Sequence, residues 1–432
     1  MTYKQAIDYL FTKHASYEHG GKSGYKPGLD VTLRLSELFG NPHEKFRSIH
    51  IAGTNGKGSV AHLIASILME SGMKVGLYTS PHFVDFNERI KVNGMPIPHE
   101  RVIEFVEDCV SMDFKENPTF FELTTILAFR YFADMQVDVA VIETGLGGRL
   151  DSTNILRPDL CVITNVGYDH TDLLGNTLEE IATEKAGIIK ENTPVVVGEV
   201  TGKVRDVMLE TSRKLNSHIV LAGDSGEVRG ATFRKGGLML KSWNFGMIRT
   251  PLWGNYQVKN VGVVLECVKV LQGLEYEIGC KAVLTGFANV VKNTGLIGRW
   301  TLLNEHPKVI CDSGHNLPAF IETSVQLKSY SYKTLRIVIG FMKDKDVAQM
   351  LSLLPKSRAK YYFVNAKVGR AMPAETLRMM AEDLGRVGAS YGSVAEGYKA
   401  ARAASGPRDL VFVGGSMYVL AELFAFLEKE KS

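Results

Sequence analysis

The chain has 432 residues, of which 45% are hydrophobic and 22% charged, and its formal net charge is +3. This length exceeds what one hydrophobic core usually serves and predicts two domains. The ordinary composition is typical of a globular protein, and the small charge gives no support for a nucleic-acid surface.

No apolar stretch approaches the length of a membrane span, and residues 1–11 lack the apolar core of a signal peptide. We therefore expect a cytoplasmic protein with no membrane partner. No Cys-x-x-Cys pair occurs, which predicts reduced thiols rather than a disulfide framework. The five cysteines are Cys109, Cys161, Cys267, Cys280 and Cys311.

Hydrophobic periodicity divides the chain into alternating strands and helices. A short amphipathic helix is expected at residues 3–11, and Asp30 is a candidate N-cap for a helix that ends near Gly40. Turn signals at 93–94 and 236–237 predict two hairpins. In the first part of the chain, strands are expected at 49–51, 74–79, 137–143, 160–164 and 195–197, and helices at 57–68, 99–111, 121–134, 177–190, 257–271 and 279–291.

The same alternation restarts after a linker-like segment at 294–298. Strands are then expected at 309–312, 335–340, 361–365 and 410–413, with a last helix at 417–430. We therefore predict an α/β protein with a mostly parallel P-loop domain at 1–293 and a smaller Rossmann-like domain at 299–432. Because ligands bind at the carboxyl ends of parallel strands, we expect a cleft between the two domains.

Residues 53–59, Gly-Thr-Asn-Gly-Lys-Gly-Ser, follow the first predicted strand and open a helix. This strand–loop–helix order is typical of a phosphate-binding loop, in which glycines let backbone N–H groups converge. Lys57 would reach the β- and γ-phosphates and Ser59 would offer a hydroxyl to Mg²⁺, with the helix N-terminus adding positive potential. The spelling departs from the strict motif because Gly58 intervenes before Ser59, and a plain strand-to-helix turn is the alternative.

Polar residues end three further strand regions: Ser80, Glu143 and His170. A carboxylate that closes an apolar strand is costly unless it is paired or bound to a cation, so Glu143 is a candidate Mg²⁺ ligand. A salt bridge from Glu143 to Arg149 is the alternative. His170 is an unusual ligand for Mg²⁺, which prefers oxygen, and a structural role remains open for it.

Seven motifs follow one another along the chain. They are residues 53–59, 79–82 (Thr-Ser-Pro-His), 87–90 (Asn-Glu-Arg-Ile), 143–154 (Glu-x-Gly-Leu-Gly-Gly-Arg-Leu-Asp-x-Thr-Asn), 169–170 (Asp-His), 184–187 (Glu-Lys-Ala-Gly) and 312–316. Together they resemble the folylpolyglutamate synthase/dihydrofolate synthase family, which belongs to the Mur-ligase-like ATP-dependent amide ligases. The resemblance extends to Gly414-Gly-Ser-Met-Tyr418. The chain departs from the family at Tyr256-Gln257, where His-Gln is usual, and at Asp312-Ser-Gly-His-Asn316, where Asp-Gly-Ala-His-Asn is usual.

The resemblance implies that ATP phosphorylates a substrate carboxylate and that glutamate then attacks the acyl phosphate. It also implies two Mg²⁺ ions held by Ser80, Glu143 and His170, with Ser59 serving the first ion, and a carbamylated Lys185. A carbamate converts a cation into an anion that can coordinate Mg²⁺, whereas an ordinary salt-bridged lysine is the alternative. The nucleotide contacts implied are the loop residues Gly53, Thr54, Asn55, Gly56, Lys57, Gly58 and Ser59, with Asn260 for adenine, Arg299 for the phosphates and Asp312 for the ribose.

Incoming glutamate needs cationic and hydrogen-bonding partners. Matched motifs offer Arg89, His315, Ser416 and Tyr418, and His315 is also a candidate to remove the amine proton. For Arg299, an interdomain salt bridge is the alternative to a phosphate contact.

In bifunctional members of the family, a pterin pocket combines three pieces that this chain also contains. Asp151 would accept from the ring N–H donors and Phe121 would stack on the ring. Helix capping and core packing are the alternatives for Thr119 and Phe121. The residues involved are Gly28, Leu29, Asp30, Thr119, Phe121 and Asp151.

We therefore expect a monomeric ligase that acts on dihydropteroate and on folates, with a monofunctional folylpolyglutamate synthase as the first alternative. A peptidoglycan-type Mur ligase would need a further domain before the loop, where only about 50 residues stand. A P-loop switch NTPase would leave Arg299, Asp312 and His315 unexplained.

Overall fold

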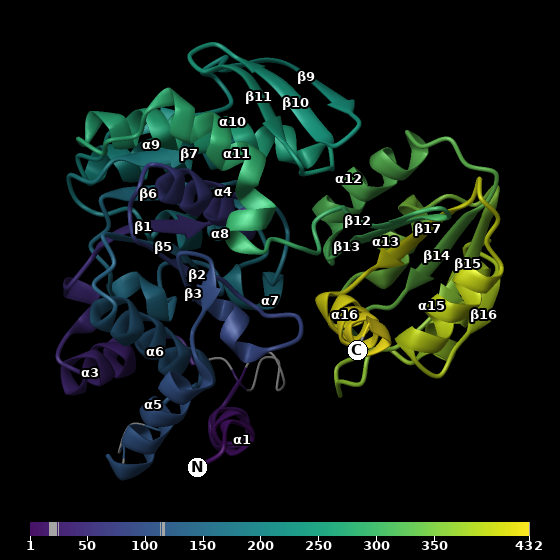
Figure 1. Cartoon of the computed structure of the whole chain (residues 1–432), viewed down its shortest axis with the longest axis horizontal. Helices are drawn as coiled ribbons and strands as arrows, with labels where there is room; N and C mark the ends of the chain where they lie inside the picture. The colour runs from purple at the N-terminus through teal and green to yellow at the C-terminus, as the bar shows by residue number, and fades with distance from the viewer. Residues whose placement is uncertain (17–23, 25, 113, 115–116, 432) are drawn as a thin grey trace. The chain divides into compact units, whose positions relative to one another are not determined.

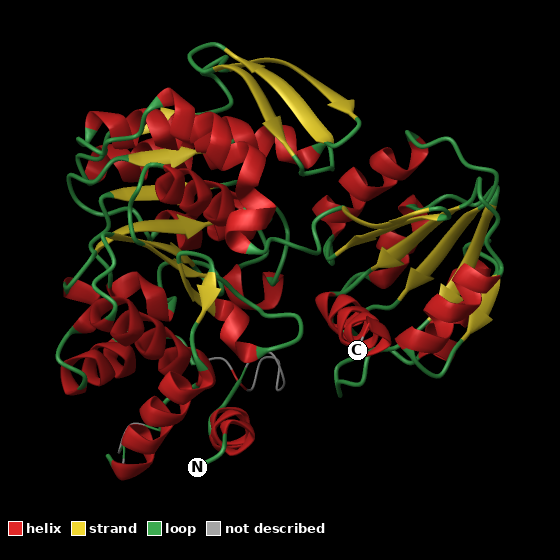
Figure 2. Cartoon of the chain, viewed as in Figure 1, coloured by secondary structure: helices red, strands yellow, loops and turns green. Residues whose placement is uncertain are grey.

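The computed structural model describes residues 1–16, 24, 26–112, 114 and 117–431. The chain divides into two compact units. Unit 1 contains residues 1–82, 86–251 and 257–296, and unit 2 contains residues 83–85, 252–256 and 297–432. In each unit strands form a sheet with helices on its faces (Figure 2).

The described part of unit 1 contains an eight-stranded sheet in the order β4-β3-β2-β5-β1-β6-β7-β8. Strands β2, β5, β1, β6, β7 and β8 run parallel, whereas β3 is antiparallel to both of its neighbours, β2 and β4. Their bounds are β1 Arg47–Ala52, β2 Val75–Tyr78, β3 Ile90–Val92, β4 Met95–Pro96, β5 Val139–Glu143, β6 Leu160–Ile163, β7 Val195–Val197 and β8 Ile219–Leu221. The central strands are buried on both faces, which explains their nearly continuous apolar sequences.

Helices cover both faces of this sheet (Figure 1). On one face α4 packs closely against α11, and α10 lies beside them. The other helices of unit 1 include α3, α5 and α6, which lie across the sheet from α4 in Figure 1. The helices are α1 Tyr3–Lys13, α3 Asp30–Leu38, α4 Lys57–Glu70, α5 His99–Ser111, α6 Phe120–Asp134, α7 Thr171–Leu174, α8 Leu178–Ala186, α9 Gly202–Lys214, α10 Tyr256–Gly273 and α11 Cys280–Thr294, with short 3-10 helices η2 Pro42–Glu44, η3 Phe86–Arg89 and η4 Ser152–Ile155.

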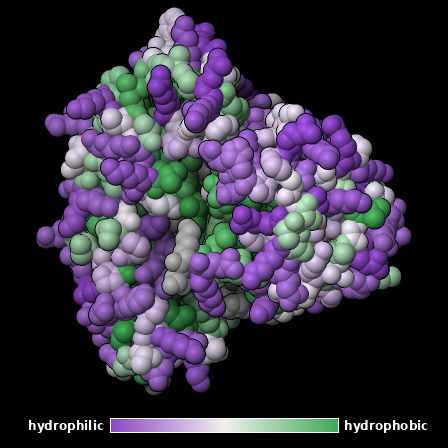
Figure 3. Space-filling view, turned by 45° about the vertical axis from the view of Figure 1, so that its right-hand side comes forward, coloured by the Kyte–Doolittle hydropathy of each residue, from purple (hydrophilic) through white to green (hydrophobic). Residues whose placement is uncertain are grey.

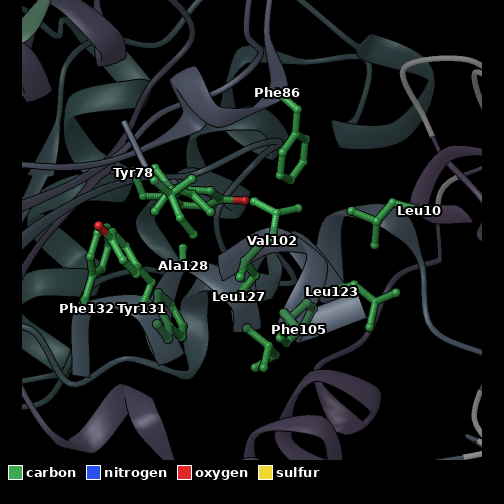
Figure 4. Packing of buried hydrophobic residues seen from close by; sticks show 14 of the residues in the cluster. Leu10, Tyr78, Phe86, Val102, Phe105, Leu123, Leu127, Ala128, Tyr131 and Phe132 are labelled. Carbon is green, nitrogen blue, oxygen red and sulfur yellow. The ribbon is translucent and has the colours of Figure 1, made fainter. Parts of the chain in front are cut away.

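A large apolar cluster joins the α6 face of the sheet to the surrounding helices (Figure 4). Tyr78 of β2 and Phe86 of η3 share this cluster with Leu10 of α1 and Phe105 of α5. The cluster therefore fixes the loop between β2 and β3, which carries Ser80, to the body of unit 1.

A separate antiparallel sheet, in the order β11-β10-β9, contains the predicted hairpin at 236–237. Its strands are β9 Val228–Arg234, β10 Gly237–Ser242 and β11 Gly246–Thr250.

Unit 2 contains a six-stranded sheet in the order β12-β13-β17-β14-β15-β16, and all its neighbouring pairs except β12–β13 are parallel. Its strands are β12 Thr301–Glu305, β13 Lys308–Asp312, β14 Leu335–Ile339, β15 Ala359–Phe363, β16 Gly388–Ser390 and β17 Leu410–Gly414. Its helices are α12 Leu317–Lys328, α13 Val347–Leu353, α14 Ala374–Asp383, α15 Val394–Ala403 and α16 Met417–Lys431. The predicted α/β fold class is confirmed.

Several expectations need correction or completion. Asp30 is the first residue of α3 rather than its N-cap, because Leu29 takes the cap position without a side-chain hydrogen bond. The sequence reading did not resolve α9, β8, β11, β12 or β16, which are short, exposed or edge elements. All five cysteines are free, and of these only Cys280 is exposed.

Hydrophilic residues, purple in Figure 3, cover most of the visible surface of each unit. None of the described helices is long and apolar enough to cross a membrane.

Gly286 sets the close packing of α11 on α4. A Cβ at this position would lie 2.6 Å from the Ile67 Cα atom, which belongs to the backbone of α4. We expect Gly286→Ala to lower the free energy of unfolding by about 1–3 kcal/mol, because the two helices must move apart. Chemical denaturation measures this change. The control is Gly273→Ala at the end of α10, where a Cβ meets nothing within 4 Å, and equal losses in both variants would contradict the packing argument.

Candidate active site

The glycine-rich loop lies between β1 and α4, at the carboxyl end of the central strand. Gly53 and Gly56 have φ angles of +152° and +85°, so both occupy backbone regions that favour glycine. A Cβ at Gly53 would overlap the Thr164 hydroxyl, and one at Gly56 would overlap the Asn260 side-chain oxygen. The loop therefore depends on glycine for both its conformation and its close contacts.

Segments from elsewhere in the sheet hold this loop in place. The Asn55 amide donates to Asn165 Oδ1 at 3.0 Å, and the Thr164 hydroxyl donates to the Asn55 carbonyl at 2.6 Å. The Thr54 hydroxyl both donates to the Gly167 carbonyl and accepts from the Gly167 amide. The residues after β6 thus determine the shape of the loop after β1.

The start of α10 supports the loop from another direction. Gln257 Nε2 lies 3.2 Å from the Ser59 hydroxyl, and Asn260 Nδ2 donates to Gln257 Oε1 at 2.9 Å. Asn260 is therefore placed under the loop at Gly56, and its predicted adenine contact stays a prediction. Sequence reasoning assigned no role to Gln257, Thr164 or Asn165. The signal for the last two was their position directly after a buried strand.

Lys57 is the first residue of α4, and its Nζ donates to the Gly53 carbonyl at 3.1 Å. The ammonium therefore folds back over its own loop. Ser59 lies two residues further on and is 1% exposed.

Glu143 and Ser80 lie together beside the glycine loop. Glu143 ends β5 and pairs in register with Ile51 of β1, while β2, which precedes Ser80, flanks β5 on its other side. The Ser80 amide donates to Glu143 Oε2 at 3.3 Å, and the Glu143 side chain is only 4% exposed. Arg149, the suggested ion-pair partner of Glu143, instead donates to Glu184 Oε1 at 2.7 Å.

His170 is the N-cap residue before α7 and has a left-handed conformation, with φ of +49°. Asp169 precedes it, and Asp169 Oδ1 accepts from the His170 amide at 2.9 Å. Both side chains lie in the segment that follows β6, the same strand whose end holds the glycine loop.

Lys185 in α8 is buried, with 3% of its surface exposed. Burial and, to a lesser extent, the positive charge of Lys57 lower the pKa of Lys185 to about 7, against the opposing effects of Asp169 and Asp151. Near neutral pH a large fraction of this amine is therefore uncharged and able to act as a nucleophile.

The predicted pterin residues lie around the loop that follows β5. The Phe121 ring faces Gly145, where a Cβ would lie 2.5 Å from the Phe121 Cζ atom. Asp151 is 5% exposed, and it accepts from the Leu146 amide at 2.8 Å and from the Thr153 hydroxyl at 2.5 Å. Burial raises the pKa of Asp151.

Thr119 forms a capping box with Glu122 at the start of α6. The Thr119 hydroxyl accepts from the Glu122 amide at 3.2 Å, and Glu122 Oε2 accepts from the Thr119 amide at 2.6 Å. Thr119 therefore has the helix-capping role that is the alternative to a pterin contact. Gly28 and Leu29, which are also predicted to line the pterin pocket, lie directly before α3.

Arg89 is predicted to contact glutamate, but its side chain is fully buried. Its Nε donates to His82 Nδ1 at 2.8 Å, and its guanidinium lies 5.2 Å from the centre of the Phe120 ring. Its glutamate role stays a prediction.

The remaining predicted residues lie in unit 2 at the carboxyl ends of β13 and β17, where Asp312 and Gly414 pair in register. Asp312 Oδ2 accepts from the Tyr256 hydroxyl at 2.7 Å and from the Trp300 amide at 2.8 Å. Tyr256, which departs from the family pattern, thus anchors Asp312, and burial raises the pKa of its hydroxyl well above the usual value.

Four other predicted residues flank this edge of unit 2. His315 Nδ1 lies 3.1 Å from the Ser313 carbonyl, which can only accept, so in the neutral ring Nδ1 carries the hydrogen and Nε2 the lone pair. Ser416 is buried before α16, and its hydroxyl accepts from the Tyr418 amide at 3.2 Å. Arg299 stands between Gly298 and Trp300, just before β12. The predicted residues are therefore divided between the two units.

Comparison with known proteins gives the family. Residues 51–268 match the Mur ligase middle domain, and residues 298–417 match the Mur ligase, glutamate ligase domain. Dihydrofolate synthase/folylpolyglutamate synthase of Bacillus subtilis is 33% identical over 94% of this chain and 97% of its own length. The chain belongs to the folylpolyglutamate synthase/dihydrofolate synthase family. The predicted resemblance and the predicted class of ATP-dependent ligase are thereby confirmed.

Other members of the folylpolyglutamate synthase/dihydrofolate synthase family differ in their named activities. Folylpolyglutamate synthase of Lacticaseibacillus casei is 31% identical over 97% of both chains. A probable bifunctional folylpolyglutamate synthase/dihydropteroate synthase of Haloferax volcanii is 34% identical over 98% of this chain, which spans 50% of that protein. Escherichia coli FolC in complex with DHPP and ADP superposes with a TM-score of 0.84 at 29% identity, covering 100% of this chain and 99% of that one.

Gly56 offers a direct test of the loop. We expect Gly56→Ala to weaken ATP binding by at least about tenfold, because the new methyl group strains the left-handed backbone and overlaps the Asn260 side chain. Isothermal titration with ATP measures the effect. The matched control is Gly72→Ala, since Gly72 has a similar φ of +90° with nothing within 4 Å, and ATP affinity that falls equally in both variants would contradict a specific role for the loop.

Proposed function

We propose that this chain ligates L-glutamate to dihydropteroate and to tetrahydrofolylpolyglutamates, using ATP and an acyl phosphate, with release of ADP and phosphate. The observation that carries this proposal is the placement of Glu143 and Ser80 beside the glycine loop, with a 3.3 Å hydrogen bond between them. A buried carboxylate next to a phosphate-binding loop supports phosphoryl transfer rather than simple nucleotide storage.

The residues at this position suit Mg²⁺ chemically. Glu143 supplies a carboxylate, and Ser80 and Ser59 supply hydroxyl oxygens, which are the ligand types that Mg²⁺ prefers. His170 would add a nitrogen ligand to a second ion. Bound Mg²⁺ would neutralise negative charge on the transferring phosphoryl group.

The chain's own groups account for the phosphoryl transfer. The backbone N–H groups of the loop and the Lys57 ammonium would hold the phosphates. An oxygen of the substrate carboxylate attacks the γ-phosphorus while the bond to the ADP oxygen breaks. The product is an acyl phosphate, whose phosphate is a far better leaving group than the oxide of a free carboxylate.

Amide formation then requires a neutral glutamate amine. Attack of the amine on the acyl carbon expels phosphate, and the nitrogen must lose a proton. We assign this proton to His315, because the contact with the Ser313 carbonyl leaves the lone pair on Nε2. Arg299, Asp312, Ser416 and Tyr418 remain the proposed nucleotide and glutamate contacts of unit 2.

Dihydropteroate use is supported by the position of Phe121 and Asp151 around the same loop. A second candidate is a monofunctional folylpolyglutamate synthase. It is favoured by the capping roles of Thr119 and Asp151, whose polar atoms already bond to their own segments.

The decisive experiment is a coupled assay of ADP and phosphate release. We expect release only when L-glutamate and an acceptor are both present, because the acyl phosphate forms on the acceptor carboxylate. Comparing dihydropteroate with tetrahydrofolate as acceptor separates the dual from the single activity. ATP turnover that does not change without acceptor and glutamate would reject the ligase and support a switch NTPase.

A matched pair of variants accompanies this assay. Glu143→Ala should lower turnover by more than about a hundredfold, because charge on the phosphoryl group loses its counter-charge. Glu179→Ala should stay active, since this carboxylate in α8 is exposed and pairs only with the surface Lys203. A fully active Glu143→Ala protein would remove Glu143 from the site.

We also propose that Lys185 carries a carbamate. The neutral amine forms a bond to the carbon of CO₂ and loses a proton, so a depressed pKa favours the reaction. The pKa of about 7 predicts that the carbamate accumulates above pH 7 and is lost as the pH falls through this value. The modification would turn a buried cation into an anion near Lys57.

Nuclear magnetic resonance with ¹³C-bicarbonate measures this group directly. We expect a carbamate signal at pH 8 that declines by pH 6 and is absent in Lys185→Ala, whose activity short carboxylates should partly restore. Lys190→Ala is the control, because Lys190 also has a pKa lowered by burial but bonds to the Asn154 carbonyl. A signal that survives in Lys185→Ala would refute the assignment.

A further inference from the structure

A buried chain of hydrogen bonds connects the central strand of unit 1 to the Asp151 carboxylate. His50 lies in β1, paired in register between Ile142 and Cys161, and its side chain is completely buried. His50 Nε2 lies 2.8 Å from Thr153 Oγ1, which in turn lies 2.5 Å from Asp151 Oδ1. Neither His50 nor Thr153 takes part in the proposed phosphoryl transfer or amide formation.

The direction of these hydrogen bonds follows from their donors. In the ionised form of Asp151, which is the form that can accept from a pterin ring, the carboxylate can only accept, so Thr153 Oγ1 gives its one hydrogen to Asp151. The same oxygen must then accept from His50, which assigns the hydrogen of the imidazole to Nε2. Burial lowers the pKa of His50 to about 3, so the ring is neutral at physiological pH.

The second ring nitrogen supports this assignment. His50 Nδ1 is buried and has no hydrogen-bond partner among the described residues. With the hydrogen on Nε2, the only unsatisfied group is the acceptor Nδ1. With the hydrogen on Nδ1, a buried N–H would have no acceptor and the Thr153 oxygen would lose its donor, so this tautomer costs more. The cationic groups near this chain are Lys185, close to Asp151, and Lys190, close to His50.

We infer that His50 is a positioning residue for the dihydropteroate site, where it acts through Thr153 to orient the Asp151 carboxylate. This inference rests on the proposed function, in which Asp151 accepts from the pterin ring. Asp151 Oδ1 is fixed by the Thr153 hydroxyl, and the Leu146 amide holds Oδ2. The carboxylate plane is therefore set before the substrate arrives.

The hydrogen-bond chain also supports the charge that recognition needs. Burial raises the pKa of Asp151, and the hydrogen bonds from Thr153 and Leu146 oppose this rise because they favour the ionised form. In a low-dielectric interior, successive hydrogen bonds polarise one another, so the His50 N–H strengthens the Thr153 donor. An anionic, oriented carboxylate is the acceptor that an amino group and a ring N–H can recognise together.

Steady-state kinetics with two His50 variants test the role. We expect His50→Leu to raise the KM for dihydropteroate about tenfold, the usual effect of one lost hydrogen bond, with kcat and the KM for ATP nearly unchanged. His50→Gln should restore most of the affinity, because its amide N–H stands near the position of Nε2. An unchanged KM for dihydropteroate, or equal losses for every substrate, would overturn the inference.

Cys161→Ala provides the matched control. Cys161 lies opposite His50 in the sheet register and is equally buried, but it bonds to the Ile188 carbonyl rather than to Thr153. It should lose stability without a selective change in the KM for dihydropteroate. If His50→Leu fails to fold, Thr153→Val removes the same link and Thr153→Ser retains it, and equal affinities in these two variants would count against the relay.

The hydrogen position can be read without any turnover. In protein labelled with ¹⁵N-histidine, the His50 signals are those lost in His50→Gln, and we expect a neutral ring with hydrogen on Nε2 from pH 6 to 8. Hydrogen on Nδ1, or a protonated ring, would overturn the relay. A wild-type protein that ligates glutamate only to folates would refute the dual activity and the substrate role of His50. The spectrum would still test the hydrogen-bond chain from His50 through Thr153 to Asp151.

Discussion

The close approach of the glycine loop to its neighbours is the constraint on which the candidate site depends. The loop has almost no side-chain volume at Gly53 and Gly56, and the groups that would collide with a Cβ there, Thr164 and Asn260, come from distant parts of the chain. Backbone N–H groups can converge on a phosphate only if the loop is held in this unusual conformation. The end of β6 and the start of α10 therefore belong to the candidate phosphate site as much as the loop itself.

Two buried carboxylates of the candidate site are held in the same way, by backbone amides. Asp151, in the loop after β5, accepts from the amides of Leu146 and Thr153, and Asp312, at the end of β13, accepts from the amides of Trp300 and Gly314. Such bonds offset the cost of burying a charge and fix the direction of the remaining lone pairs. A capping role and a binding role are thus compatible, because the cap orients the group that a ligand would meet.

The sequence allowed most of the fold and part of the site to be predicted. The buried strands β1, β5 and β6 were found because a strand covered on both faces must be apolar along its length. Strand order was not predictable, since β5 lies between β2 and β1 although it follows both in sequence. The adjacency of Glu143, Ser80 and the glycine loop was therefore expected only from a general rule for parallel sheets.

The sequence did not predict which side chains of the candidate site contact one another. Arg149, the alternative partner of Glu143, pairs with Glu184. Asn260 lies close to Gly56, a contact that the sequence does not predict, and its adenine contact stays a prediction. Gln257, part of a motif that departs from the family, contacts Ser59. The contacts of Asn260 and Gln257 depend on how α10 meets the loop, which hydrophobic periodicity does not specify.

Lys57 and Lys185 show how the proposed carbamate would change the site. In the unmodified protein the positive charge of Lys57 adds to the effect of burial in lowering the pKa of Lys185. The Lys57 ammonium donates to the Gly53 carbonyl of its own loop. A carbamate on Lys185 would reverse the sign of that interaction, so that the second lysine attracts the first rather than repelling it. The same buried position that makes a charged amine costly would thereby yield a fixed anion opposite the phosphate-binding lysine.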